Sequence, residues 1–187
     1  MPITRASLPV LQALEFVVEL ARKFGPRVEE LLVRRAERQK EIDGRQLPDF
    51  LSQTHAIRER DWHVTAIPAD LQDRRVEITG PTERKMIINA LNSGAKVFMA
   101  DCEDSMTPTW DNVASIHAQA DARDAAARRI EFTSPEGKAY KLNPQIATLI
   151  VRPRGWHLFE KHVLVDGKQV PGAFVDFGLY LFHNHAE

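Results

Sequence analysis

Two carboxylates follow an apolar run that has the length of a buried strand. The run reads Lys-Val-Phe-Met-Ala and leads into Asp101, Cys102, Glu103 and Asp104. Because side chains alternate along a strand, we expect Asp101 and Glu103 on one side and Cys102 on the other. Paired carboxylates at a strand end suit a divalent cation, held directly or through water, since hard cations take oxygen ligands. A second interpretation stays open, in which Asp104 and Ser105 cap the next helix and the other two carboxylates face solvent.

An arginine ends another apolar run. Residues 147–151 read Ala-Thr-Leu-Ile-Val, and Arg152 follows them. A guanidinium at the end of a buried strand needs an anion, and its planar fork suits paired carboxylate or carbonyl oxygens. The anion is either a ligand or one of the carboxylates expected on the neighbouring strand, namely Asp101, Glu103 or Asp104. Pro153 cannot donate to a ladder, so we expect strand pairing to lapse there.

A third pattern is a strand-to-helix turn followed by two cations, Arg84 and Lys85. Such a turn can hold a phosphate or a nucleotide, because backbone N–H groups point outward at the start of a helix. Basic residues there oppose the helix dipole, which indicates that they serve something outside the helix. On its own this pattern is not specific.

The elements that would position these residues can be read from periodicity. Apolar residues at helical spacing predict two helices, 8–24 and 27–41, separated at Gly25-Pro26. The connection over residues 45–75 is irregular and charged, and its length favours a segment packed against something. Strands then alternate with helices: strands at 76–79, 96–102 and 147–152, helices at 82–92, 110–129 and 174–182, and hairpins around 132–142 and 163–168.

This alternation is typical of an α/β fold, with a parallel sheet covered by helices. In α/β barrels the chemistry stands at the carboxyl ends of the strands, where Asp101 and Arg152 are expected. Only three strand–helix units are present, whereas a closed barrel of this type needs eight. The chain is therefore either a small open sheet or an incomplete barrel.

Composition excludes several classes of protein. The chain has 187 residues, 43% of them hydrophobic and 27% charged, which is the balance of a globular domain. Its net charge of −1 gives no support for a nucleic-acid partner. No apolar stretch is long enough for a membrane span, and the first residues do not form a signal peptide, so we expect a cytoplasmic protein. The single cysteine, Cys102, excludes an intrachain disulfide framework and a Cys-rich zinc site.

Four long stretches together resemble the N-terminal part of malate synthase of the A type. These are residues 67–81, 97–105, 149–158 and 176–180. The resemblance implies that residues 1–70 form an N-terminal helical element with its connection. It implies that residues 71–187 form the first three β/α units of a TIM (β/α)8 barrel, with hairpin insertions and an incomplete barrel. One departure is Cys102, where the family more often has an aromatic residue; its side chain should face away from the acidic pair.

The same resemblance implies an acyltransferase of the glyoxylate bypass, which feeds the tricarboxylic acid cycle. Such an enzyme condenses acetyl-CoA with glyoxylate and water, giving malate and CoA, with Mg²⁺ as cofactor. In this chain Arg152 matches the catalytic arginine. Asp101 and Glu103 match outer-shell carboxylates that hold metal-bound water. The CoA contacts fall at Ser105 and around Arg84 and Lys85.

The resemblance also implies what a fragment of this kind lacks. The direct metal ligands and the general base of the family would lie beyond Glu187, so we expect the chain alone to be inactive. A peroxisomal or glyoxysomal address would lie at a later C-terminus and stays open, as does the oligomeric state. Two alternatives are a citrate-lyase-β-like C–C lyase and a non-catalytic half-barrel that binds acyl-CoA.

Overall fold

The computed structural model describes residues 8–112 and 117–185, and its first element is one long helix. Helix α1 runs over Leu8–Asp43 with Pro26 inside it, so the predicted division into two helices at Gly25-Pro26 is wrong. A proline removes one backbone hydrogen bond and crowds the preceding turn. Here the helix packs on one core on both sides of the proline, through Ala21 and Val28. Exposed ion pairs also join it to one hairpin: Arg22 to Asp166 at 2.8 Å and Lys168 to Glu29 at 3.0 Å.

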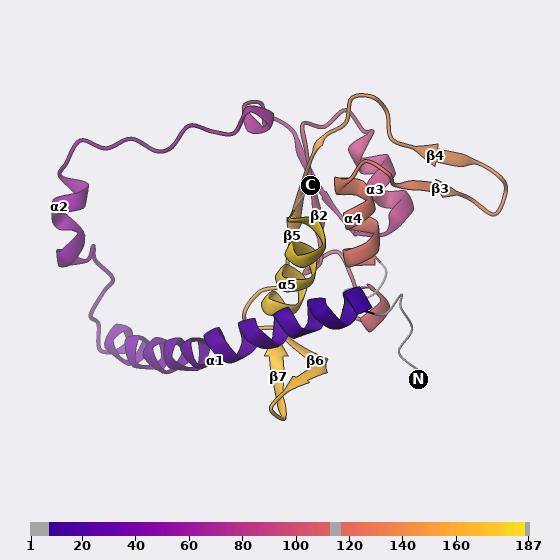
Figure 1. The fold of residues 1–187 in the computed structure, drawn as a ribbon. Helices are drawn as coiled ribbons and strands as arrows, with labels where there is room; N and C mark the ends of the chain where they lie inside the picture. Colours follow the sequence, from indigo (N-terminus) through magenta and orange to yellow (C-terminus); the bar gives the residue numbers. More distant parts are fainter. Residues whose placement is uncertain (1–7, 113–116, 186–187) are drawn as a thin grey trace.

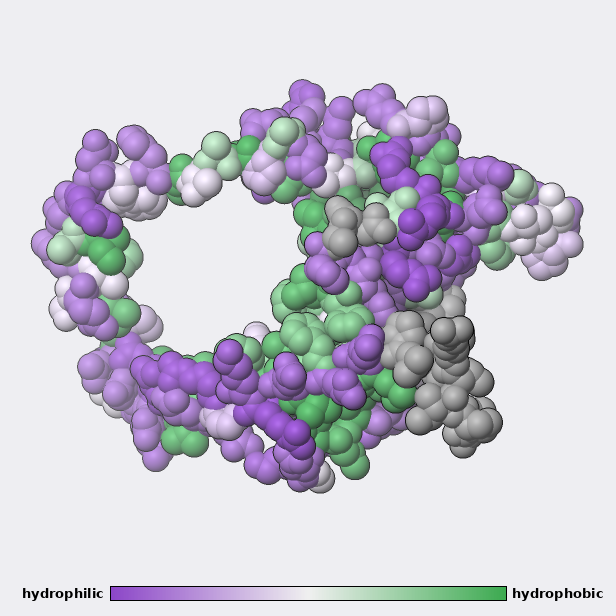
Figure 2. Space-filling model, viewed as in Figure 1, coloured by the Kyte–Doolittle hydropathy of each residue, from purple (hydrophilic) through white to green (hydrophobic). Residues whose placement is uncertain are grey.

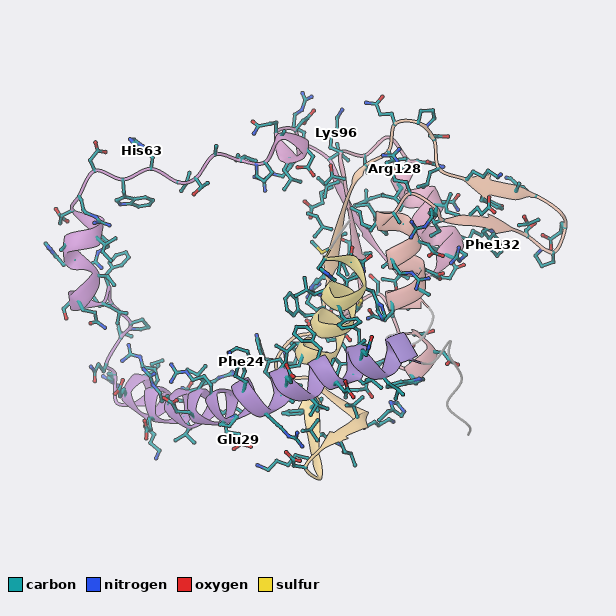
Figure 3. All side chains as sticks on the ribbon, in the orientation of Figure 1. Phe24, Glu29, His63, Lys96, Arg128 and Phe132 are labelled. Atoms are coloured by element: carbon teal, nitrogen blue, oxygen red, sulfur yellow. The ribbon has the colours of Figure 1, made fainter. Side chains whose placement is uncertain are left out.

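The connection after α1 is exposed along its length. It contains the short turns η2 (Ser52–Thr54), α2 (His55–Arg58) and η3 (Ala69–Leu71), and it makes an open arc between α1 and the sheet. Its apolar side chains are largely solvent-exposed, to 77% at Phe50 and 80% at Val64. Side chains do not fill the arc, as Figure 2 shows, and His63 stands out from it in Figure 3. The expectation of a packed connection is therefore wrong within the described residues.

The apolar stripe predicted for the second half of α1 is also exposed. Leu31, Leu32 and Val33 lie on this stripe, and each is at least 46% exposed. Val28 alone of the expected stripe is packed, against the core that α1 shares with α5. Only the first half of α1 therefore contributes a continuous buried face.

Three parallel strands form the sheet. They are β1 (Glu77–Gly80), β2 (Val97–Asp101) and β5 (Thr148–Arg152), in the order β1-β2-β5. Helix α3 (Arg84–Leu91) joins β1 to β2, as predicted, and Gly94 ends that connection with a positive φ of 87°. Within the described residues β1 and β5 each pair on one side only, so the sheet is open at both edges.

The second crossover is longer and less regular than predicted. The helix expected over 110–129 falls partly on residues 113–116, which lie outside the described residues. Its described part contains a π-helical turn, η5 (His117–Asp121), which leads into the short helix α4 (Ala122–Ala126). The predicted hairpin follows as β3 (Glu131–Thr133) and β4 (Ala139–Lys141), and it projects from the body in Figure 1.

The chain beyond β5 confirms the last two predicted elements. Strands β6 (Phe159–Val165) and β7 (Lys168–Pro171) form an antiparallel hairpin, which leads into helix α5 (Gly172–Asn184). Helix α5 packs on α1, where Gly178 permits the approach. A Cβ at Gly178 would lie 2.9 Å from a methyl carbon of Val17.

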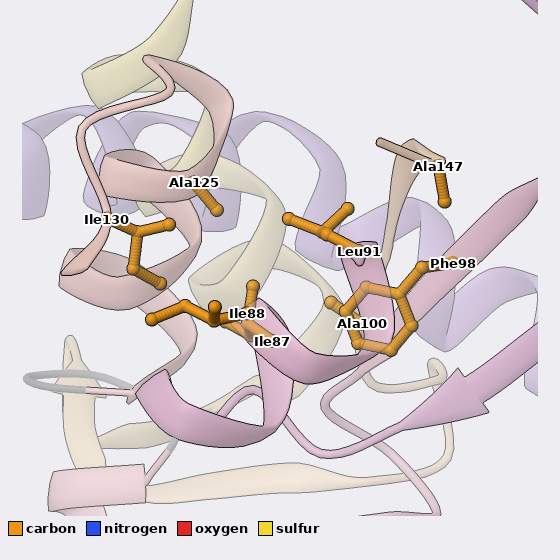
Figure 4. Close-up of a cluster of buried hydrophobic side chains, with 8 residues drawn as sticks. All are labelled: Ile87, Ile88, Leu91, Phe98, Ala100, Ala125, Ile130 and Ala147. Carbon is orange, nitrogen blue, oxygen red and sulfur yellow. The ribbon is translucent and has the colours of Figure 1, made fainter. Parts of the chain in front are cut away.

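Two hydrophobic cores hold these elements. One joins α1, α5 and the β6–β7 hairpin around Val17, Val175 and Phe174. The other lies between α3, the sheet and α4, and Figure 4 shows its members: Ile87, Ile88, Leu91, Phe98, Ala100, Ala125, Ile130 and Ala147. The fold is thus mixed α/β with a partial parallel sheet. Across the described ranges, no helix has both the length and the apolar character needed to cross a membrane.

Candidate active site at the carboxyl ends of β2 and β5

The parallel pairing of β2 and β5 brings the two predicted chemical groups together. Asp101 is the register partner of Arg152, and both residues end their strands. The N–H of Cys102 donates to the carbonyl of Arg152 at 3.1 Å, which extends the ladder by one step. The expectation that pairing lapses at Pro153 is confirmed, because β5 ends at Arg152.

The guanidinium of Arg152 lies among three carboxylates. Its Nη1 is 3.3 Å from Oδ2 of Asp101 and 2.7 Å from Oδ2 of Asp104, while Nη2 is 3.0 Å from Oε1 of Glu103. The hydrogen bond that Arg152 donates to Asp104, aided by the charges of all three carboxylates, raises the pKa of Arg152, so the group stays protonated. The structure therefore forms the ion pair that the sequence left open, and Asp101 and Glu103 share one side as predicted.

Asp101 organises the loop that follows β2. It is 1% exposed, and its Oδ1 accepts the backbone N–H groups of Glu103 at 2.9 Å and Asp104 at 3.2 Å. Its Oδ2 accepts the hydroxyl of Ser105 at 3.4 Å. The helix-capping interpretation of Asp104 and Ser105 is not supported, because Thr109 Oγ1 accepts the backbone N–H of Asn112 where the next helical turn begins.

Glu103 lies against the chain that leaves β5. A Cβ at Gly155 would meet Oε2 of Glu103 at 2.8 Å, and it would meet the ring of His157 at the same distance. A larger residue there would require the carboxylate of Glu103 and the exposed ring of His157 to move. The segment after Arg152 thus forms one wall of the site, and Gly155 fixes how closely Glu103 can approach it.

The charge of this cluster indicates what it attracts. Three carboxylates surround one guanidinium, so the group as a whole favours a further cation, and its donors are the oxygens that a hard divalent ion prefers. Both oxygens of Asp101 accept hydrogen bonds from the loop and from Arg152, so a metal-bound water would share them with these donors, whereas Oε2 of Glu103 faces Gly155 and His157. Among the described residues, no three His, Cys, Asp or Glu side chains are placed to ligate a metal directly. The donor set fits carboxylates that hold metal-bound water.

The direct metal ligands implied by the resemblance are expected after the last residue of this chain. Glu187, beyond which the resemblance places the direct metal ligands, lies outside the described residues. The expectation about those ligands therefore stays a prediction.

The other two predicted site residues have their contacts outside this cluster. Arg84 donates to Oδ1 of Asp121 at 2.7 Å and to Oδ2 of Asp124 at 2.6 Å, which connects α3 to η5 and α4. Lys85 has its ammonium 5.3 Å from the centre of the Tyr140 ring. The carboxylate of Glu83 accepts the first backbone N–H groups of α3, so the helix is capped by its own chain.

Sequence reasoning missed a buried ion network next to the site. Arg154, Glu160 and Asp176 are 1–3% exposed, and Arg154 bridges the other two at 2.8 Å each. Burial raises the pKa of Asp176. A signal existed in the sequence, since Asp176 interrupts an apolar helix next to Phe174 and Val175, where a charge requires a partner.

Comparison with known proteins gives two family matches. Residues 11–56 match the malate synthase N-terminal domain, and residues 148–187 match the malate synthase TIM barrel domain. The second match contains Arg152 and the whole β6–β7–α5 segment.

Individual relatives match nearly the whole chain. Malate synthase of Myxococcus xanthus is 57% identical over 176 residues, which is 94% of this chain and 32% of the relative. Malate synthase A of Escherichia coli is 53% identical over 174 residues, which is 93% of the chain and 32% of the relative. Glyoxysomal malate synthase of Zea mays is 52% identical over 183 residues, with 97% and 32% covered. The chain thus spans about a third of the length of the relatives that it matches.

Proposed function

The chain belongs to the malate synthase family, and on that premise we propose that it carries part of an acyltransferase site. The reaction condenses acetyl-CoA with glyoxylate and water, giving malate and CoA. The observation that carries the proposal is Arg152, fixed at the end of β5 beside the acidic end of β2. The malate synthase relatives favour this reaction over the lyase alternative.

Arg152 supplies electrostatic stabilisation in this proposal. Removing a proton next to the thioester places negative charge on the enolate oxygen, and a fixed cation lowers the energy of that charge. The raised pKa of Arg152 keeps the cation protonated throughout, so its role is neither acid nor base. Asp104 is the most exposed of its three partners, at 66%, and is the one that an anionic substrate can replace.

Asp101 and Glu103 would hold Mg²⁺ through water in the same site. The bound ion would polarise the aldehyde of glyoxylate for attack by the enolate. The support for this assignment is the set of carboxylate oxygens around Arg152 and the position of Oε2 of Glu103 beside Gly155.

The CoA contacts are proposed at Ser105, Arg84 and Lys85. Lys85 is the more available of the two cations. Its ammonium lies over the uncharged Tyr140 ring, whereas Arg84 is paired with two carboxylates. Arg84 would have to release Asp121 or Asp124 to reach a phosphate. Loss of affinity for CoA in Lys85→Ala, with Arg84→Ala less affected than Lys85→Ala, would support this order.

The architecture and location complete the proposal. Residues 1–70 are the helical element with its connection, and residues 71–187 are the first part of a TIM barrel whose sheet edges are met by further strands. We place the protein in the cytoplasm with small-molecule substrates as its partners, although several plant relatives are named glyoxysomal. Imaging of the tagged protein in its own cell tests that location.

The activity is tested by release of the CoA thiol. The protein at its natural encoded length should release thiol from acetyl-CoA only when glyoxylate is also present. The 187-residue chain alone should release none, because the family's direct metal ligands and general base are expected beyond Glu187. Turnover by this chain alone would contradict the claim of inactivity, and glyoxylate-independent release would contradict the reaction.

A further inference from the structure

The buried network beside the site holds the main chain as well as side chains. Asp176 on α5 accepts three hydrogen bonds from one residue, Arg154: Oδ2 accepts the backbone N–H at 2.8 Å and Nε at 3.0 Å, and Oδ1 accepts Nη2 at 2.8 Å. A carboxylate that binds both the backbone and the guanidinium of one residue fixes that residue's position and its side-chain direction.

Glu160 on β6 closes the other side of the network. Its Oε2 accepts Nη1 of Arg154 at 2.8 Å, while its Oε1 accepts the backbone N–H of His162 at 2.8 Å and lies 2.5 Å from Nδ1 of the same residue. Arg154 is thus held between α5 and β6. Such a buried ion network is poor evidence for stability, because the cost of removing the charges from water offsets their attraction. A structural role in fixing geometry accounts for it better.

The fixed residue is two positions from Arg152. The carbonyl of Arg152 accepts from Cys102 on the β2 side, Pro153 has a restricted φ, and Arg154 is anchored by Asp176. Gly155 comes next and meets Glu103. Four consecutive residues therefore connect the anchor to both the guanidinium and one carboxylate of the site.

We propose that Asp176 is a positioning residue, which sets Arg152 and Glu103 by holding the backbone of Arg154. The kinetic part of this inference rests on the proposed function. A distant mutation that displaces catalytic groups by about 1 Å can lower the rate on the order of 100-fold. Loss of the three hydrogen bonds that anchor Arg154 should therefore lower kcat measurably.

The test compares Asp176→Asn with Asp166→Asn in the protein at its natural encoded length. Both variants neutralise an aspartate that holds an arginine, but Asp166 is exposed on the β6–β7 turn. Its φ of 51° is one that asparagine tolerates. Hydrogen–deuterium exchange of the peptide containing Arg154 should become about tenfold faster in D176N, because the carboxamide offers one acceptor oxygen where two oxygens met the three donors of Arg154. D166N should match the wild type.

Steady-state kinetics separate positioning from mere stability. We expect D176N to lower kcat by about 10- to 100-fold and to leave the KM for acetyl-CoA within about twofold. If D176N does not fold, Gly172→Ala replaces it, since a Cβ there would lie 3.0 Å from Nε of Arg154 and would push the same side chain. That variant should shift both readouts in the same direction by a smaller factor.

The outcomes distinguish the two proposals. Wild-type exchange at Arg154 in D176N overturns the anchor, whatever the enzyme does. Faster exchange with an unchanged kcat per folded molecule overturns the positioning role and leaves the proposed function intact. A wild-type protein that releases no thiol defeats the proposed function, while the exchange experiment still decides whether Asp176 holds this segment.

Discussion

Asp101 and Arg152 face each other in register across two parallel strands, with Nη1 of the arginine 3.3 Å from Oδ2 of the aspartate. The other oxygen of Asp101 accepts two backbone N–H groups of the loop that carries Glu103 and Asp104. One buried carboxylate therefore joins the arginine to the loop that supplies its other partners.

Replacing Asp101 by asparagine should loosen that loop. The amide keeps the shape but presents N–H₂ where Arg152 or the backbone donates, and an unsatisfied buried group costs about 1–3 kcal/mol. Asp104→Asn is the matched control, because Asp104 meets the same guanidinium from an exposed position. Urea unfolding should show a clearly lower free energy of unfolding for D101N and little change in it for D104N. Equal losses would contradict the assigned role of Asp101.

Gly155→Ala should disturb the site from its wall. The added methyl group would lie 2.8 Å from both Glu103 and His157, so the carboxylate of Glu103 and the exposed ring of His157 would have to move. Gly80→Ala is the control, since its Cβ would meet only Phe98 at 3.4 Å, an ordinary contact. In the protein at its natural encoded length, G155A alone should lower both the rate of glyoxylate-dependent thiol release and the free energy of unfolding in urea. An active and stable G155A protein would show that Glu103 is free to move.

Cys102 should be unreactive in the folded chain. Burial first, and then the charge of Asp176, raises the pKa of the thiol to about 12, from an ordinary value of 9.0. A raised pKa favours the neutral thiol, so its contribution to stability is complete below the unfolded pKa and is lost as the pH rises toward about 12. A thiol reagent at about pH 8 should label the unfolded chain quickly and the native chain slowly. Rapid stoichiometric labelling of native protein would contradict the buried placement.

The connection after α1 should be the first part of the chain to be cut. Arg45 and Arg60 lie in an exposed segment that has no strand pairing and whose apolar side chains contact little else. Brief trypsin treatment should cleave there while the sheet, α3 and α5 remain intact.

The exposed side chains of the same connection, Phe50 and Val64 among them, should also drive association of the isolated chain, which light scattering measures. A monomeric chain that resists trypsin would contradict this structure of the connection.

Periodicity was sufficient for the elements whose burial is local. The strands that end in Asp101 and Arg152 and helix α5 follow their apolar patterns: β2 is buried on both faces, β5 is half-buried throughout, and α5 is buried over most of its first two turns. Pro26 misled the prediction because α1 packs on one core on both sides of the proline, through Ala21 and Val28, and that core is built from residues far away in sequence. The connection misled it because a long loop usually packs within its own chain.

The site residues were predictable only where the pattern of a single strand placed them at its carboxyl end. Asp101, Glu103 and Arg152 were predictable from alternation and from the strand ends that carry them. Arg154 and Asp176 were not, because their pairing depends on how α5 returns to β5, which no local pattern encodes. The partners of Arg84 were hidden for the same reason, since Asp121 and Asp124 come from a distant helix.

The most direct test of the proposed function is a chimera, in which this chain replaces the matching part of a relative. Residues 1–187 would replace the matching third of Escherichia coli malate synthase A, which is 53% identical over 174 residues. The chimera should release CoA thiol when both acetyl-CoA and glyoxylate are supplied. Arg152→Lys should abolish most of that release, because lysine lacks the fork that meets Asp101 and Glu103. A folded chimera whose Arg152→Lys variant works at the unsubstituted rate would contradict the account.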